Sequence, residues 1–126
     1  MPAAMTLPDP RATDGSSPLP RDAAERLADL MFALATPSRL QILAALRGGP
    51  RTVSEIIGVV RMEQSAVSHQ LRVLRDHRVV TVERRGRERL YMLCDEHVRA
   101  LLDHARRHVL ELERPGARSK RVERAG

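Results

Sequence analysis

Residues 62–75 read Met-Glu-Gln-Ser-Ala-Val-Ser-His-Gln-Leu-Arg-Val-Leu-Arg, and their pattern predicts a helix. Its apolar residues Val67, Leu71 and Leu74 recur at the spacing of one helix face. A shorter apolar helix is predicted just upstream, from Thr52, with an acid three residues later as in a capping box. Only a few residues separate the two helices, which is the spacing of a helix-turn-helix.

The same periodicity predicts three more helices around this pair. Asp22 with Glu25 gives the first helix a capping start, and Thr36 followed by Pro37 begins the second. The apolar side of the second helix is formed by Leu40, Leu43 and Leu46. In full, the predicted helices cover residues 22–35, 36–47, 52–60, 64–77 and 96–113.

After residue 77 the apolar period changes to two. Val80 and Val82, then Leu90 and Met92, flank a turn at residues 85–87, which predicts a β-hairpin. A basic hairpin that follows a helix-turn-helix is a wing. The predicted fold is therefore mainly α with a β-hairpin wing, a winged helix-turn-helix.

Composition narrows the function. The chain has 126 residues, a net charge of +6 and a pI of about 11.1, a balance that favours a polyanionic partner. Its two aromatic residues are too few to stack single-stranded bases. The one cysteine, Cys94, excludes an internal disulfide framework, and we expect it to be a small buried residue at a strand end. Apolar runs are too short for a membrane span and no secretory signal is visible, so the cytoplasm is the expected location.

The polar face of the 64–77 helix is the candidate DNA-reading surface. It carries Gln64, Ser65, Ser68, His69 and Arg72. Small polar groups near a helix N-terminus reach base edges, and arginine reaches phosphate. Eight arginines and four acids between residues 61 and 89 leave a surplus of four positive charges, to which Arg85 and Arg87 contribute in the wing. The competing interpretation is an ordinary solvated helix face.

Two motifs resemble a known family. Residues 33–40, Ala-Leu-Ala-Thr-Pro-Ser-Arg-Leu, are similar to the opening signature of the ArsR/SmtB family of metal-sensing bacterial repressors, and residues 62–75 are similar to its recognition helix. The resemblance covers about residues 22–113 and is strongest to the zinc sensors and the mycobacterial nickel/cobalt sensor. It implies a winged-helix homodimer that binds an inverted-repeat operator and dissociates when metal binds. In place of the family's usual glycine in the turn stands Arg61, which is strained if the turn needs a positive φ.

The chain is predicted to divide into three segments. Residues 1–20, which hold five of the eight prolines, are predicted to form a disordered arm. Residues 21–113 are predicted to form the DNA-binding and dimerisation domain. Residues 114–126 are predicted to be a basic flexible tail, either solvated or in non-specific contact with phosphate.

The 96–113 helix and the residue before it carry candidate metal ligands. His97 and His108 are eleven residues apart and therefore share a helix face, with His104 and Glu111 on the same side. Neutral imidazole and carboxylate suit Zn²⁺, Co²⁺ or Ni²⁺. For any one histidine, a solvated or dimer-edge position is the commoner interpretation, but two histidines aligned with two carboxylates favour a metal site.

Distance decides how such a site is built. His97 and His108 lie about 16 Å apart along one helix, at about 1.5 Å per residue, so one helix cannot close both on a single ion. Two antiparallel copies can, with Asp95 and His97 from one chain and His108 and Glu111 from the other. The resemblance implies the same pattern at these positions. A symmetric dimer then has two sites.

The donor set favours zinc among the three metals. Two oxygens and two nitrogens fit tetrahedral zinc, and residues 112–126 contain no further histidine. His104 would add a fifth ligand, which leaves nickel and cobalt open. A ligand histidine is also expected to donate its second ring nitrogen to a main-chain carbonyl near His77 or Arg78.

The sequence is compatible with two functions from different classes. The first is a metal-responsive repressor that binds double-stranded DNA as a homodimer. The alternative is a winged-helix regulator, a repressor or an activator, that a partner protein controls and that has weak or vestigial metal binding. An enzyme acting on a small organic substrate is not expected, because Ser68 and His69 have no orienting acid nearby in sequence and no phosphate loop is present.

Overall fold

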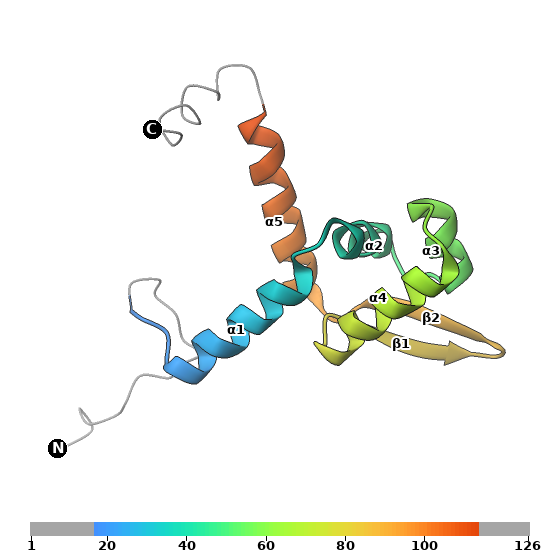
Figure 1. Cartoon of the computed structure of the whole chain (residues 1–126), viewed down its shortest axis with the longest axis horizontal. Helices are drawn as coiled ribbons and strands as arrows, with labels where there is room; N and C mark the ends of the chain where they lie inside the picture. Colours follow the sequence, from blue (N-terminus) through green and yellow to red (C-terminus); the bar gives the residue numbers. More distant parts are fainter. Residues whose placement is uncertain (1–16, 114–126) are drawn as a thin grey trace.

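Among the residues that the computed structural model describes, 17–113, the elements follow the predicted order. The predicted arm, for its residues 1–16, and the whole predicted tail, 114–126, lie outside the described residues. Figure 1 shows the elements in chain order. They are α1 (Arg21–Leu34), α2 (Pro37–Arg47), α3 (Val53–Val60), α4 (Gln64–Asp76), β1 (Val80–Arg85), β2 (Glu88–Leu93) and α5 (Glu96–Leu112).

Local capping chemistry sets most of the helix starts. The Thr36 hydroxyl accepts a hydrogen bond from the Arg39 amide at 3.2 Å at the start of α2, with Pro37 in the first helical position. Thr52 and Glu55 form the predicted capping box at the start of α3. The predicted cap at Asp22 is wrong. The helix α1 begins one residue earlier, directly after a proline that has no side-chain hydroxyl or carboxylate to offer.

The core lies between α2, α3, α4 and the inner face of the hairpin. The predicted stripe of α4 is confirmed, because Val67, Leu71 and Leu74 are at most 1% exposed. On α2 the prediction holds for Leu43 and Leu46 but not for Leu40, which is 45% exposed on the side facing α5. The remaining fully buried side chains are Ile42, Ile56, Val79 and Val80.

The hairpin lies where it was predicted, but in its second strand the side chains that face the core are the ones that were predicted to face outward. Antiparallel pairing sets Val80 against Leu93 and Val82 against Tyr91, so Tyr91 and Leu93 are buried where Leu90 and Met92 were predicted to face inward. A shift of one residue turns every side chain of a strand to the other face. The buried faces of α2 and α3 select this register.

The same alternation exposes Cys94, so the prediction of a buried cysteine is wrong. Leu93 points into the core, and the next side chain along the strand direction therefore points out. The Cys94 backbone still belongs to the fold, since its N–H donates to the Val79 carbonyl at 2.9 Å.

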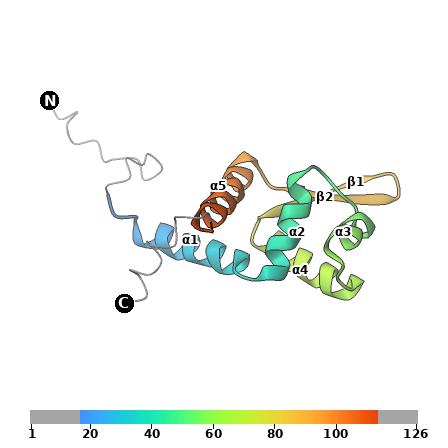
Figure 2. The same cartoon turned by 90° about the horizontal axis from the view of Figure 1, so that it is seen from above.

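The helices α1 and α5 lie at the edge of this core, to which α1 contributes Leu34 and against which Leu101 and Leu102 of α5 pack. Figures 1 and 2 show them at one end of the molecule, with α3 and the hairpin tip at the other. No residue of α5 is buried, and α1 buries only Ala33 and Leu34 at its end. Several large apolar side chains on these two helices are therefore exposed: Leu27, Met31, Phe32, Val109 and Leu110. Within residues 17–113 no helix has the length and apolar character needed to cross a membrane.

Candidate nucleic-acid interface and sensor helix

The turn between α3 and α4 contains a strained residue. Arg61 ends α3 with φ 57° and ψ 45°, in the left-handed region, and its N–H donates to the Ile57 carbonyl at 2.8 Å. The positive φ on which the predicted strain depends is therefore confirmed. Glycine populates this region without a Cβ penalty, whereas arginine does not. The turn is short because the chain reverses at this one residue, and α4 begins three residues later.

The predicted reading residues are all exposed on α4. The buried stripe of this helix fixes its orientation, and the opposite face carries the polar side chains Gln64, Ser65, Ser68, His69 and Arg72. The structure thus brings these five onto one open face of α4, with Gln64, Ser65, Ser68 and His69 in its N-terminal half and Arg72 just beyond. Their contact with DNA remains a prediction.

Sequence reasoning missed the contact that holds α4 to α1. The guanidinium of Arg39 donates to the Gln70 side-chain oxygen at 3.0 Å and to the carbonyls of Phe32 and Ala33 at the end of α1. The sequence did single out Arg39 as part of the 33–40 motif, but nothing in that motif indicates which residue it contacts. Gln70 is 31 residues away, so only the folded chain brings the two together.

The predicted wing arginines are exposed at the hairpin tip. Arg87 lies in the two-residue connection between the strands, where Gly86 has φ 60°. Arg85 lies 3.7 Å from a Glu83 carboxylate oxygen, in a pair of two exposed side chains that contributes little. Both guanidinium groups are therefore accessible to a phosphate backbone.

Two of the predicted metal ligands are neighbours at the start of α5. Asp95 is the N-cap: its Oδ1 accepts a hydrogen bond from the Val98 amide at 3.0 Å, and its Oδ2 lies 3.7 Å from Nδ1 of His97. The hydrogen bond from the Val98 backbone holds the pKa of Asp95 below its usual range. The His97 side chain is 98% exposed. One carboxylate oxygen and one imidazole are therefore open to solvent side by side.

The other predicted ligands lie on the C-terminal half of the same helix. His104, His108 and Glu111 are all exposed. Within residues 17–113 of one chain, no group of three or more candidate ligands converges on a point that could hold an ion. In this part of the chain, no candidate ligand histidine donates to a main-chain carbonyl near His77. His77 itself has its Nδ1 atom 2.9 Å from the Val73 carbonyl oxygen. One chain therefore presents two separate half-sets of ligands.

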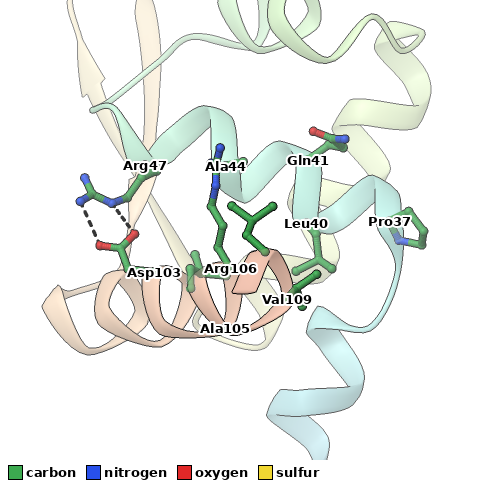
Figure 3. A pocket seen from close by; sticks show the side chains of 11 residues that line it. Pro37, Leu40, Gln41, Ala44, Arg47, Asp103, Ala105, Arg106 and Val109 are labelled. Atoms are coloured by element: carbon green, nitrogen blue, oxygen red, sulfur yellow. Dashed lines mark hydrogen bonds and ion pairs between the residues drawn. The ribbon is translucent and has the colours of Figure 1, made fainter. Parts of the chain in front are cut away.

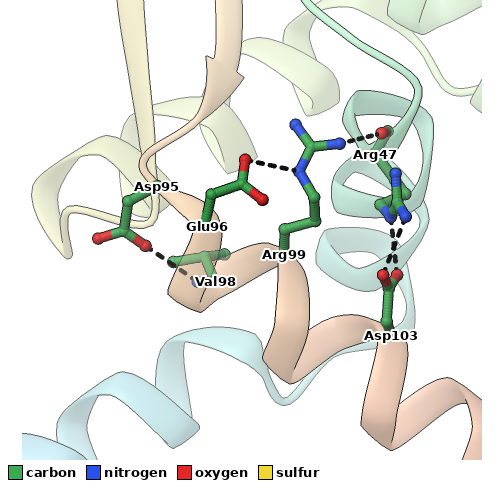
Figure 4. A network of polar contacts seen from close by, with 6 residues as sticks. All are labelled: Arg47, Asp95, Glu96, Val98, Arg99 and Asp103. Carbon is green, nitrogen blue, oxygen red and sulfur yellow. Dashed lines mark hydrogen bonds and ion pairs between the residues drawn. The ribbon is translucent and has the colours of Figure 1, made fainter.

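Two contacts join α5 to the end of α2. Arg47 donates two hydrogen bonds to the Asp103 carboxylate, at 2.7 and 2.9 Å, and Arg99 donates to the main-chain carbonyl of Arg47 at 2.9 Å (Figure 4). The guanidinium of Arg47 holds the pKa of Asp103 below its usual range. Nothing in the sequence pattern pairs residues 56 apart, and these contacts were not predicted.

An apolar groove runs beside these contacts, between α2 and α5. Its volume is about 520 Å³, and Figure 3 shows Leu40 of α2 and Val109 of α5 directed toward each other across it. Ala44, Leu102 and Leu110 add to its apolar lining. No described residue fills this groove, so the apolar side chains of α5 that line it stay exposed in a single chain.

Known proteins share this sequence pattern. The family described as "Bacterial regulatory protein, arsR family" matches residues 36–82. The HTH-type transcriptional regulator NmtR of Mycobacterium tuberculosis is 53% identical over 93 residues, which cover 74% of this chain and 78% of that protein. A transcriptional repressor SmtB homolog of Synechocystis is 40% identical over 90 residues, 71% of this chain and 68% of that protein.

Solved structures agree with the sequence matches. The solution structure of apo-NmtR superposes with a TM-score of 0.66 at 46% identity, covering 85% of this chain and 95% of that one. A homodimeric winged helix-turn-helix DNA-binding domain, Mb0332 of Mycobacterium bovis, superposes with a TM-score of 0.68 at 27% identity, covering 82% and 94%. The predicted winged helix-turn-helix fold is confirmed.

Proposed function

The chain belongs to the ArsR family of bacterial regulatory proteins, and from this premise we propose that it is a transcriptional repressor that binds operator DNA as a homodimer and releases it when a metal ion binds. The members it matches are transcriptional regulators, not enzymes. The observation that carries the proposal is that one chain exposes both the polar side chains predicted to read DNA, on α4, and the two half-sets of candidate metal ligands, on and just before α5. The partner-controlled alternative has no comparable support.

The reading surface supports DNA binding through the major groove. The exposed polar side chains at the N-terminal half of α4 reach base edges, while Arg85 and Arg87 in the wing reach phosphate. In a two-fold dimer, the two α4 helices would stand about 34 Å apart, one turn of B-DNA, which matches an inverted repeat. Operator binding implies action in the cytoplasm.

The exposed apolar faces of α1 and α5 support the homodimer. Met31 and Phe32 on α1 are 43% and 76% exposed, and Val109 and Leu110 on α5 are each more than half exposed. Apolar side chains grouped in this way on a small domain mark an interface. A second copy would bury them, and the similar domain from Mycobacterium bovis is itself homodimeric.

The metal proposal rests on how the ligands divide along α5. Asp95 and His97 lie at its start, and His108 and Glu111 lie near its end, too far along one helix to share an ion. Two antiparallel α5 helices would pair each half-set with the complementary half-set of the partner chain. Asp95 fits this role because its Oδ1 caps the helix and its Oδ2 is left for the ion.

Zinc is the metal we propose, and nickel or cobalt would be favoured if His104 joined the site as a fifth ligand. The ion would supply one chemical function only, which is to hold the two α5 helices in a fixed relation. The dimer arrangement that binds the ion better would differ from the one that fits the operator. The linkage is reciprocal, so operator DNA weakens metal binding by the same factor.

A titration tests this function. A duplex is first selected by the purified metal-free dimer from random sequence, and its Kd is then measured by fluorescence anisotropy as zinc, nickel or cobalt is added. We expect tight binding without metal and a rise in Kd of about 5- to 150-fold with the sensed metal. Operator binding that none of the metals changes would contradict the sensor and support control by a partner protein.

A further inference from the structure

A second cavity lies between the recognition helix and the wing, on the side of the molecule away from α5. Its volume is about 470 Å³. Figure 1 shows α4 lying beside the hairpin. Residues of both elements line the cavity. We call it the helix–wing pocket; its lining consists of Ser68, Arg72, Arg75 and Asp76 of α4, Arg89 and Tyr91 of β2, and Val53 at the start of α3.

The helix–wing pocket is strongly positive. Three arginines line it and only one carboxylate, Asp76, opposes them. Among residues 17–113, the guanidinium groups of Arg72, Arg75 and Arg89 make no hydrogen bond and no ion pair, whereas Arg39, Arg47 and Arg51 of the same domain all do. The pocket therefore presents guanidinium N–H donors that have no hydrogen-bond acceptor among the described residues.

Strand pairing adds to this charge. Arg89 lies directly opposite Arg84 across the hairpin, and like charges at such a position destabilise a strand pair. Both residues continue the register of Val82 and Tyr91. Arg89 lines the pocket beside α4, whereas the Arg84 guanidinium donates to the Gly86 carbonyl in the hairpin turn, at 3.4 Å. An anion bound at this place would relieve the repulsion.

The floor of the pocket is rigid. Tyr91 is 7% exposed, and its backbone N–H and C=O pair with Arg51, at 2.8 and 2.9 Å, just before α3. The guanidinium carbon of Arg89 lies 6.0 Å from the centroid of the Tyr91 ring, a cation–π distance that holds this side chain toward the pocket. Arg72 and Arg75 project from successive turns of α4, whose buried stripe fixes their direction.

The position of the pocket identifies its anion. A recognition helix in the major groove and a wing beside it lie on the two sides of one sugar–phosphate backbone. The pocket lies between these two elements and shares Ser68 and Arg72 with the reading face. Planar guanidinium groups match phosphate oxygens in a bidentate way.

We infer that the helix–wing pocket binds one DNA phosphodiester in each operator half-site, with Arg75 and Arg89 as contacts beyond those predicted from sequence. The inference rests on the proposed DNA binding and deepens it. A phosphate held here, between helix and wing, fixes the register of α4 along the groove without reading a base. Arg89 is the decisive residue, because it is the arginine that the wing contributes to the lining of the pocket.

The test combines a protein variant with a DNA variant. Operator duplexes are made with one methylphosphonate per half-site, moved stepwise along each strand, and binding is measured for the wild-type dimer and for Arg89→Gln, Arg75→Gln and the control Arg78→Gln. Arg78 lies just beyond α4, is exposed and does not line the pocket. For the wild type, we expect one neutralised phosphate per half-site to weaken binding by about tenfold or more.

The signature of the pocket is non-additivity. In Arg89→Gln the same neutralised phosphate should cost clearly less than in the wild type, because only the α4 side of the pocket still contacts it, whereas in Arg78→Gln it should cost the full factor. The slope of log K against log salt should fall by about 0.9 for each phosphate that Arg89→Gln no longer neutralises. Arg89→Lys keeps the positive charge but loses the planar guanidinium group, so its operator affinity should lie between those of the wild type and Arg89→Gln. Circular dichroism and thermal melting confirm that each variant is folded.

Two outcomes would overturn the inference, and a third would contradict the proposed function on which it rests. Additive losses at every phosphate would show that Arg89 contacts no particular one, which overturns it. Inorganic phosphate that shifts the Arg89 side-chain NMR signal, together with unchanged operator binding by Arg89→Gln, would assign the pocket to a free anion and overturns it as well. A wild-type dimer that prefers no duplex over random DNA would contradict the proposed function itself, before the pocket is tested.

Discussion

The guanidinium of Arg47, at the last turn of α2, faces the carboxylate of Asp103 on α5 with two parallel hydrogen bonds of 2.7 and 2.9 Å (Figure 4). Such a fork fixes orientation as well as distance. It joins the helix that carries the proposed metal ligands to the helix that packs against α3 and α4. Arg99 strengthens the joint by donating to the Arg47 carbonyl. We therefore expect a change in the angle of α5 to be transmitted to α2 through this pair.

Asp103→Asn should weaken the response to metal more than it weakens either binding step. The amide keeps the shape of the carboxylate but gives up one of the two acceptors and the charge. We expect operator affinity without metal and metal affinity without DNA to change little, and the metal-induced change in operator Kd to shrink. Fluorescence anisotropy with and without metal measures this difference.

A charge exchange serves as the control for that substitution. The double variant with Arg47→Asp and Asp103→Arg restores an ion pair across the same two helices, and the response should return in part. If Asp103→Asn leaves the ratio of the two Kd values unaltered, the pair is only a structural contact.

Arg61→Gly should stabilise the domain by up to about 1 kcal/mol. Arg61 has φ 57°, where a Cβ costs roughly 1–2 kcal/mol, and glycine removes this penalty but adds freedom to the unfolded chain. Urea unfolding measures the change. Arg61→Ala keeps the Cβ and is the matched control, so it should not be stabilising. A loss of stability in the glycine variant would show that the arginine side chain, and not the backbone, decides the turn.

His69→Ala should lower the preference for the operator. His69 is exposed on the reading face of α4, away from its buried stripe, so its loss removes a base contact and leaves the core intact. We expect weaker binding to the selected duplex and nearly unchanged binding to random DNA. Competition assays with both duplexes make the comparison. Equal weakening on the two would assign His69 to phosphate contact or packing.

Acid should weaken α3 through its capping box. The Thr52 amide donates to the Glu55 carboxylate at 2.9 Å, and this hydrogen bond holds the pKa of Glu55 below its usual value of 4.5. A depressed pKa in the folded state means that the stabilisation is present above pH 4.5 and is lost as the pH falls through the folded value. Thermal melts of the wild type and Glu55→Gln, from about pH 7 to about pH 3, should therefore converge as the pH falls. A constant gap between them would mean that the ionised form has no advantage.

Mixed dimers test the shared metal site. In a His97→Ala homodimer each site lacks one ligand, and the same holds for His108→Ala, so both should bind metal poorly and still bind the operator. In a heterodimer of the two, one site carries both lesions and the other is intact. Isothermal titration calorimetry should find one high-affinity ion per heterodimer. No recovery in verified heterodimers would falsify a site shared across the dimer.

The predictions that succeeded from sequence depend on short-range chemistry. Thr36 with Pro37, and Thr52 with Glu55, act within four residues of the helices that they start, and the buried stripe of α4 repeats within two turns. The positive φ at Arg61 is likewise a property of one residue in a short turn. Such features need no knowledge of the rest of the chain, so the winged helix-turn-helix and its open reading face could be predicted.

The features that could not be predicted depend on contacts between residues that are far apart in the sequence. Tyr91 and not Leu90 is buried because β2 packs against α2 and α3, and a strand alone does not specify which of its faces meets them. Cys94 is exposed for the same reason. Arg39 with Gln70 and Arg47 with Asp103 join residues 31 and 56 apart, which no local period relates. Along α5 the helical period and rise already show, from the sequence, which side chains share a face and that the two half-sets of candidate ligands lie too far apart to bind one ion within about 2 Å. The attachment of α5 to α2 depends instead on the contacts of Arg47 with Asp103 and Arg99, which form only when distant segments of the chain pack together.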